Sequence, residues 1–199
     1  RYLLDTKKPY TLGAIDLQDY YFEHRWQLAQ AMRDSKKIVR EVAEDFEKTF
    51  GRKYDMYEKY MMDDAEIAIV VIGSTAGTSK VVIKELRQKG VKAGLIKIRV
   101  YRPFPSEMIV KDLANVKAVA VMDRSDSCSG TYAPVYSDVA AAMFAAGVTG
   151  PKVVNYVYGL GGREINTGHI EAVYDKLGKI ASGAEKPFTG IEYINVRLK

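Results

Sequence analysis

A glycine loop that follows an apolar stretch offers the first set of groups with which this sequence could do chemistry. From Gly73 to Thr78, the hydroxyl groups of Ser74 and Thr75 accompany a helix start, where free backbone N–H groups suit a phosphate or a carboxylate. The loop lacks the G-x-G-x-x-G spacing of a dinucleotide site, and Arg99 stands where an acidic residue would end the next strand. A tight turn capped by hydroxyl groups is the simpler interpretation.

A second glycine loop runs from Gly159 to Glu164 and also departs from the dinucleotide fingerprint. Its G-x-G-G sequence has Glu164 where the third glycine belongs. We expect Gly161 and Gly162 to adopt backbone angles that other residues avoid, while Arg163 can bind an anion or pair with a neighbouring subunit. We interpret this loop as a structural turn with an interface contact.

The loop from Asp123 to Thr131 combines carboxylates and hydroxyl groups with the lone cysteine, Cys128. A nucleophile needs a base beside it, but His24 lies in a helical pattern and His169 opens another, so neither has sequence support as that base. One cysteine and two histidines also make no metal-ligand set. We therefore predict no catalytic, cofactor-binding or metal-ligating residue in this chain, and we expect both histidines to be packed or hydrogen-bonded.

Strands alternate strictly with helices from residue 65 onward, which predicts the fold class. The continuous apolar run from Ile67 to Ile72 is typical of a strand covered on both faces. Alternation implies right-handed crossovers, so we predict an α/β fold with three αβα layers and a mainly parallel sheet. The expected strands are 67–72, 93–98, 116–122 and 153–157, with an edge strand at 190–196. Helices are expected from Thr75 or Thr78 to Gly90, after Pro105, at 134–146, and at 167–181, where Thr167 is the expected N-cap of the last helix.

The loops after these strands should share one rim, because ligands of open parallel sheets bind at the carboxyl ends of the strands. The turn from Tyr101 to Pro105 adds a fourth loop to the three described above. The candidate rim and interface residues are Gly73, Ser74, Thr75, Arg102, Asp123, Arg124, Gly161, Gly162 and Arg163.

A long amphipathic helix is predicted ahead of this domain, over residues 20–50, where apolar residues recur at steps of three to four. About 30 residues at 1.5 Å each reach roughly 45 Å, and Gly51 is a natural stop. Such a helix must lie across another surface. We expect residues 1–64 to form the helical tail of an upstream domain with a linker at 54–64, and residues 65–199 to form the α/β domain.

Composition and charge narrow the possible partners. No apolar run reaches the length of about eighteen residues that would span a bilayer, and residues 1–8 lack a secretory pattern, so a cytoplasmic protein is expected. Residues 65–199 carry 18 Lys/Arg against 12 Asp/Glu, but the basic residues are scattered singly. A nucleic-acid surface would cluster them. We predict neither a nucleic-acid nor a membrane partner.

An ordered set of short motifs resembles one family. The motifs lie at residues 9–13, 19–25, 64–75, 94–105, 119–124 and 159–164, and the strand leading to Arg102-Pro-Phe-Pro105 is the most specific. Together they resemble the C-terminal half of the alpha subunit of pyruvate:ferredoxin oxidoreductase, or pyruvate synthase, including a domain similar to the C-terminal domain of transketolase. The likeness extends over nearly the whole chain.

The resemblance implies a role within a larger complex. Complexes of this family decarboxylate pyruvate on thiamine diphosphate, pass electrons through 4Fe–4S clusters to ferredoxin, and deliver the acetyl group to coenzyme A. It implies that the thiamine-activating residues lie in the upstream part of the alpha chain, that the beta subunit holds the diphosphate and Mg²⁺, and that the clusters need cysteines absent here. We expect this chain to bind none of these cofactors alone, to be inactive alone, and to assemble with the upstream alpha segment and beta, gamma and delta subunits.

Two hypotheses remain. The first is a structural module of a thiamine-dependent 2-oxoacid:ferredoxin oxidoreductase of anaerobic metabolism, with pyruvate as the leading substrate; a departure from the family pattern at 125–132 leaves branched 2-oxoacids, 2-oxoglutarate and oxalate open. The second is a stand-alone α/β module that binds a phosphate-containing or acidic ligand at the Gly73 and Gly159 loops. An assembly module should expose apolar surface on the long helix, whereas a free-standing binder should not.

Overall fold

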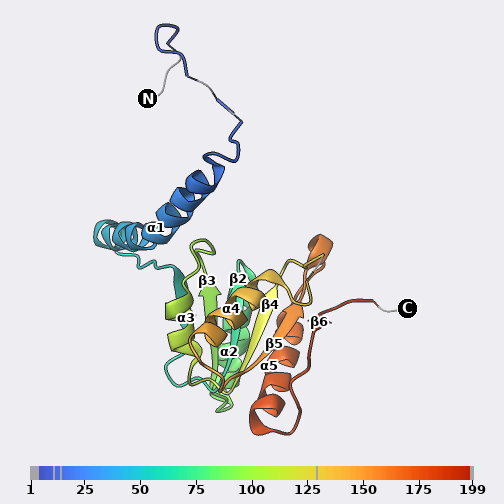
Figure 1. The fold of residues 1–199 in the computed structure, drawn as a ribbon. Helices are drawn as coiled ribbons and strands as arrows, with labels where there is room; N and C mark the ends of the chain where they lie inside the picture. The colour runs from blue at the N-terminus through green and yellow to red at the C-terminus, as the bar shows by residue number, and fades with distance from the viewer. Residues whose placement is uncertain (1–4, 11, 14, 129, 198–199) are drawn as a thin grey trace.

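The computed structural model describes residues 5–10, 12–13, 15–128 and 130–197 (Figure 1). The 9–13 motif and the 123–131 loop therefore each include one residue, Thr11 and Ser129, that lies outside the described residues. In chain order the elements are α1 (Tyr21–Phe50), β1 (Tyr57–Tyr60), β2 (Ile67–Ile72), α2 (Thr75–Gln88), β3 (Ala93–Ile98), α3 (Ser106–Leu113), β4 (Ala118–Asp123), α4 (Pro134–Ala145), β5 (Lys152–Val157), a 3₁₀ turn (Leu160–Gly162), α5 (Thr167–Ser182) and β6 (Ile191–Tyr193).

The six strands form one sheet in the order β1-β3-β2-β4-β5-β6. Strands β2 to β6 are parallel, and β1 is antiparallel to β3. From β2 the chain moves toward one edge of the sheet, to β3. It then returns to β4, on the other side of β2, and continues toward the opposite edge through β5 and β6. The gap between their carboxyl ends is the topological switch point of the sheet.

Helices cover both faces of this sheet (Figure 1). Side chains of β2 alternate between them: Ile67, Ile69 and Val71 pack in the cluster that includes α2 and α5, whereas Ala68 and Val70 pack in the cluster that includes α3 and α4. Because both faces of β2 are buried, its sequence is apolar at every position and does not alternate between apolar and polar residues. The predicted three-layer α/β fold with a mainly parallel sheet is confirmed, as is the long helix ahead of it.

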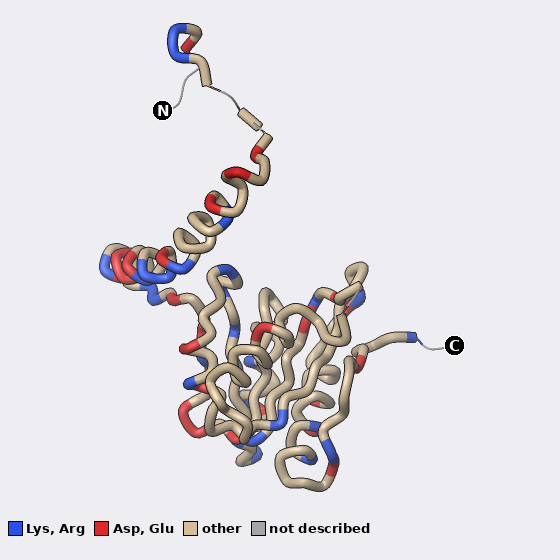
Figure 2. Tube along the Cα trace, in the orientation of Figure 1, with Lys and Arg blue, Asp and Glu red and all other residues tan. Residues whose placement is uncertain are grey.

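Helix α1 projects away from the sheet (Figure 1) and has no buried residue along its 30 positions. Its contacts with the α/β domain include an ion pair from Lys36 to Glu107 at 3.0 Å and the partly buried side chain of Val39. It ends at Gly51, which takes the left-handed conformation expected of a helix stop. Figure 2 shows charges of both signs along α1, and no helix in the described ranges is long and apolar enough to cross a bilayer.

Two details differ from the sequence-based expectations. The 54–64 segment, expected to be a linker, contains β1, because Met56 and Tyr57 are buried and the strand completes the open edge of β3. Helix α5 is capped by Asn166 instead of Thr167. The Asn166 side chain accepts a hydrogen bond from the backbone N–H of His169 at 3.1 Å, and His169 Nδ1 accepts from Asn166 N–H at 3.2 Å.

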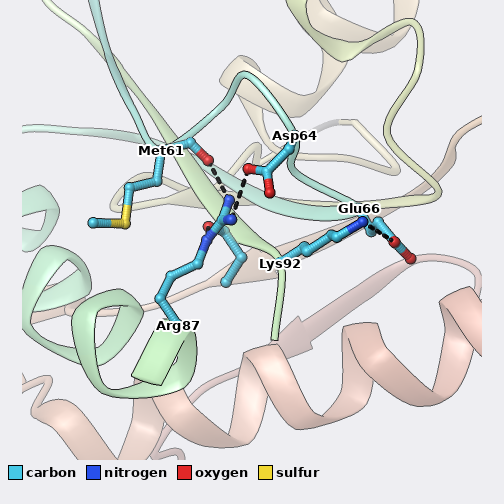
Figure 3. Close-up of polar contacts among 6 residues, drawn as sticks. Met61, Asp64, Glu66, Arg87 and Lys92 are labelled. Carbon is cyan, nitrogen blue, oxygen red and sulfur yellow. Dashed lines mark hydrogen bonds and ion pairs between the residues drawn. The ribbon is translucent and has the colours of Figure 1, made fainter. Parts of the chain in front are cut away.

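Arg87, near the end of α2, ties the connection between β1 and β2 to the sheet (Figure 3). Its Nη1 donates to the Asp64 carboxylate and its Nη2 to the Met61 carbonyl, each at 2.6 Å. Its Nε donates to the carbonyl of Ala93 at 2.8 Å. This one guanidinium therefore fixes the path of the chain at the amino end of the sheet, opposite the rim.

Glu58 attaches the edge strand β1 to its surroundings. Its carboxylate pairs with Lys80 of α2 and accepts a hydrogen bond from Arg99 at 2.5 Å. The hydrogen bond from Lys80 lowers the pKa of Glu58 below its ordinary value and outweighs burial, which acts in the opposite direction. The ionised form of Glu58 therefore stabilises the folded state.

We expect Glu58→Gln to lower the free energy of unfolding by about 1 kcal/mol at pH 7. Because the pKa of Glu58 is lower in the folded chain than in the unfolded chain, this stabilisation is present above the unfolded value of about 4.3 and is lost as the pH falls through the folded value. Urea unfolding at several pH values measures the difference between variant and parent, which should shrink in acid.

The matched control is Glu44→Gln on α1, since Glu44 forms no ion pair within the described chain. It should leave the free energy of unfolding unchanged at every pH. A Glu58→Gln deficit that stays constant down to acid pH would contradict the ion-pair explanation.

Candidate functional site

The carboxyl ends of β2 and β4 open onto a cavity of about 370 Å³ at the switch point. The loops after β2, β3 and β4, together with the starts of α2 and α4 and the end of β5, all contribute to its wall. Its lining residues are Ile72, Gly73, Ser74, Thr75, Tyr101, Met122, Asp123, Arg124, Ser125, Pro134, Val135 and Tyr158. Five predicted rim residues, Gly73, Ser74, Thr75, Asp123 and Arg124, are thus brought together.

Asp123 is 1% exposed and serves the start of α4 as an internal anion. Its carboxylate accepts hydrogen bonds from the backbone N–H groups of Val135 at 2.8 Å and Tyr136 at 3.2 Å, and from the Asn155 side-chain amide at 3.2 Å. Burial raises the pKa of Asp123, and these hydrogen bonds act against that rise. The negative charge of the Asp123 carboxylate is therefore hydrogen-bonded to the first amides of α4, where it complements the helix dipole.

The start of α2 lacks such a partner. Ser74 occupies the cap position without a side-chain hydrogen bond, and the first turn contains no acidic residue. The expected caps at Thr75 or Thr78 are therefore not formed. Ser74 and Thr75 at this helix start line the same cavity as Pro134 and Val135 at the start of α4.

Arg124 lies beside the Gly159 loop. Its Nε donates to the Gly159 carbonyl at 3.3 Å. Gly159 has φ +67°, and a Cβ at this position would lie 3.1 Å from Arg124 Nε, so both backbone conformation and space favour glycine. Arg124 is exposed and forms no salt bridge within the described ranges.

The other predicted rim residues lie outside this cavity. Arg102 packs over the ring of Tyr101 at 3.9 Å and approaches Asp138 at 2.9 Å, so it lines the outer side of the rim. Arg163 lines a smaller neighbouring cavity of about 130 Å³ formed with residues 157–160 and 193–196. Gly161 and Gly162 have φ of +62° and +81°, as expected, in the 3₁₀ turn beside it.

The remaining candidates form no reaction centre. His24 pairs with Asp16 at 2.6 Å, and His169 belongs to the α5 cap, so both histidines are hydrogen-bonded as predicted. Cys128 is exposed. Within the described ranges no group of three or more His, Cys, Asp or Glu side chains converges as a metal site, and one cysteine does not suffice for an iron–sulfur cluster.

A family model described as pyruvate:ferredoxin oxidoreductase core domain II matches residues 65–170, more than half of the chain. The chain belongs to this family. The resemblance seen in the motifs is thereby confirmed, and the matched span includes the cavity, the Asp123 network and the Gly159 loop.

Relatives of this core domain II chain include pyruvate synthase subunits PorA from Thermotoga maritima, 47% identical over 87% of this chain and 44% of the relative, and from Methanothermobacter thermautotrophicus, 37% identical over 98% and 48%. The ketoisovalerate oxidoreductase subunit VorA of Pyrococcus abyssi is 35% identical over 89% of this chain and 45% of its own. The chain spans about half the length of these relatives.

Sequence reasoning missed one residue of the core domain II cavity wall, Tyr158, and one that supports the wall through Asp123, Asn155. Asn155 is fully buried in β5, where it accepts a hydrogen bond from the Ala133 N–H at 2.9 Å and donates to Asp123. A polar residue inside the apolar 153–157 strand was the available signal, because such a group needs a partner. Tyr158, 3% exposed, gave no comparable signal in the sequence.

We expect Gly162→Val to destabilise this core domain II chain by about 1–2 kcal/mol, because a β-branched residue is strained at φ +81° even though nothing lies near the new Cβ. Thermal unfolding should show a Tm lower by about 3–6 °C.

Gly150→Val is the matched control, since Gly150 also has open space around it but no positive φ. Its Tm should stay close to that of the parent. Equal melting of Gly162→Val and the parent would argue against backbone strain in this turn.

Proposed function

We propose that this chain is a structural module of the alpha subunit of a thiamine-dependent 2-oxoacid:ferredoxin oxidoreductase. The observation that carries the proposal is the apolar surface of α1, most of which is exposed within the described chain, in a sequence that belongs to a domain family of a multi-part enzyme. In this role the chain contributes shape and contact surface. The reacting groups come from elsewhere in the complex.

The apolar surface of α1 is extensive. Large side chains between 42% and 79% exposed occur along its whole length: Tyr21, Phe22, Trp26, Leu28, Met32, Ile38, Val42 and Phe50. Leaving so many aromatic and aliphatic groups in water is unfavourable, and a patch of this kind marks an interaction surface. The partner that fits it is the upstream part of the alpha chain, with residues 1–64 acting as the helical tail of that domain and 65–199 as the transketolase-like domain.

We propose that the complex is cytoplasmic and also contains beta, gamma and delta subunits. Its other parts would hold thiamine diphosphate, Mg²⁺, 4Fe–4S clusters and coenzyme A, and ferredoxin would accept the electrons. We propose pyruvate as substrate and acetyl-CoA as product. The greater identity to a pyruvate synthase subunit, 47% against 35% for the ketoisovalerate relative, supports this choice.

The alternative of a stand-alone binder at both glycine loops has less support. Gly73 lines the switch-point cavity, whereas Gly159 lines the smaller one beside it, so the two loops do not enclose a common ligand. Such a binder would also have no use for the exposed α1 face.

The assembly role predicts that Leu28→Ser with Met32→Ser abolishes copurification of the present chain with the upstream part of the alpha subunit, expressed as a separate polypeptide. These two residues are 51% and 42% exposed and lie four positions apart, on one side of α1. Because neither is buried, the Tm of the present chain carrying the same changes should remain unchanged. Affinity copurification and thermal melting measure the two effects.

Asp34→Ser, an exposed position of α1, is the matched control and should leave assembly intact. Full assembly of the Leu28/Met32 variant would contradict the proposed role of α1.

The purified 199-residue chain should also fail to reduce a viologen dye with pyruvate, thiamine diphosphate and coenzyme A. Measured turnover would contradict the structural assignment.

A further inference from the structure

The switch-point cavity has the position and the size of a small-molecule site. Ligands of open α/β sheets bind outside the carboxyl ends of the strands where the chain direction reverses, and this cavity lies between the ends of β2 and β4. Its volume of about 370 Å³ falls at the lower end of the range of known ligand sites. That volume suits a compact molecule and is small for a dinucleotide.

Most of the cavity wall is apolar. Met122, Val135 and Tyr158 are at most 6% exposed, and the remaining apolar side chains of the wall are Ile72, Tyr101 and Pro134. A ligand with an apolar body would remove this surface from water on binding, which is favourable. A fully hydrated inorganic ion would leave these contacts unused.

Two buried residues that carry hydroxyl groups line this cavity. Thr75 is 4% exposed and Tyr158 is 3% exposed, and both line the wall. Within the described ranges neither hydroxyl is held by a hydrogen bond to another group of the chain. A hydroxyl can both donate and accept, so this pair retains a donor for a ligand.

The charge balance around the cavity favours an anion. The negative charge of Asp123 is engaged by two amides of α4 and by Asn155. In the first turn of α2 the Gly77 N–H donates to the Ser74 carbonyl at 2.8 Å, whereas Thr75 and Ala76 have neither a capping side chain nor an acidic neighbour in that turn. Arg124 brings a guanidinium without a salt bridge in the described chain. Positive groups therefore exceed the available negative ones on the α2 side.

We infer that the switch-point cavity binds a small organic carboxylate with an apolar body. The carboxylate lies among the α2 amides, the Thr75 and Tyr158 hydroxyls and Arg124, and the body packs on Ile72, Met122 and Val135. Among the described residues that line the cavity no base lies beside a nucleophile, so we assign this ligand a stabilising role and no reaction. The inference concerns this chain's own cavity and does not depend on which 2-oxoacid the complex would use.

The test is a titration of the ¹⁵N-labelled 199-residue chain with 3-methylbutanoate, followed by NMR. Saturable shifts of the amide signals of Thr75, Ala76 and Arg124 are expected, with a Kd on the order of 1 mM for so small a ligand. The uncharged 3-methylbutanamide tests the need for the carboxylate, and inorganic phosphate tests the need for the apolar body. Each should bind at least about fivefold more weakly.

Three variants assign the site. Arg124→Gln should weaken binding of 3-methylbutanoate about tenfold, and Tyr158→Phe and Thr75→Val, which keep the size of each side chain, should weaken it severalfold. Arg163→Gln is the matched control, because Arg163 lies on the same rim but lines the neighbouring cavity. It should leave the Kd unchanged. The spectrum of each variant without ligand verifies that the fold is retained.

The inference is overturned by any of three results. Shifts that do not saturate would show that the cavity holds no carboxylate. Phosphate binding as tight as 3-methylbutanoate would show that the apolar wall contributes nothing. Equal weakening by Arg124→Gln and Arg163→Gln would show a general charge effect in place of a defined site.

Discussion

Burial of β2 and β4 on both faces is the constraint on which the rest of the structure depends. Residues 68–71 and 118–121 are 0% exposed, so helices must cover the sheet on either side. Parallel pairing of these strands requires crossover connections, and every crossover returns the chain to the amino end of the sheet. All the loops that leave the carboxyl ends consequently gather at one rim, which is where the cavity, the glycine turns and the exposed arginines lie.

The rim differs from a catalytic centre in how its charges are arranged. In many α/β proteins an open helix start binds a substrate anion, but here Asp123 supplies that anion to α4 from within the chain. The neighbouring start of α2 has no internal anion. This asymmetry between two adjacent helix starts gives the rim one neutral and one electropositive side, and no base lies beside a nucleophile among the described residues.

Local sequence patterns predicted the fold well because the elements are locally specified. The apolar run 67–72 and the alternation of strands with helices were sufficient for the architecture, and Gly51 marked the end of α1. Strand β1 was missed because Tyr57–Tyr60 has two charged residues between two tyrosines, without the alternation typical of a strand, and gains its place through pairing with β3. The cavity was only partly predicted, since Tyr158 lines it from the end of β5 and Asn155 supports Asp123 from a neighbouring strand, and no local pattern encodes such contacts.

The arrangement of α1 has a consequence for how the chain folds. Its contacts with the rest of the molecule are few, and the packing of an amphipathic face supplies most of the stability of a helix in a protein. The α/β layers can therefore reach their native state before the helix acquires its partner, so the two parts behave as separate cooperative units. Amide protons along Tyr21–Phe50 would then exchange with solvent long before those of β2 and β4, and under the proposed assembly role the packing of α1 against its partner would complete the folding of the polypeptide.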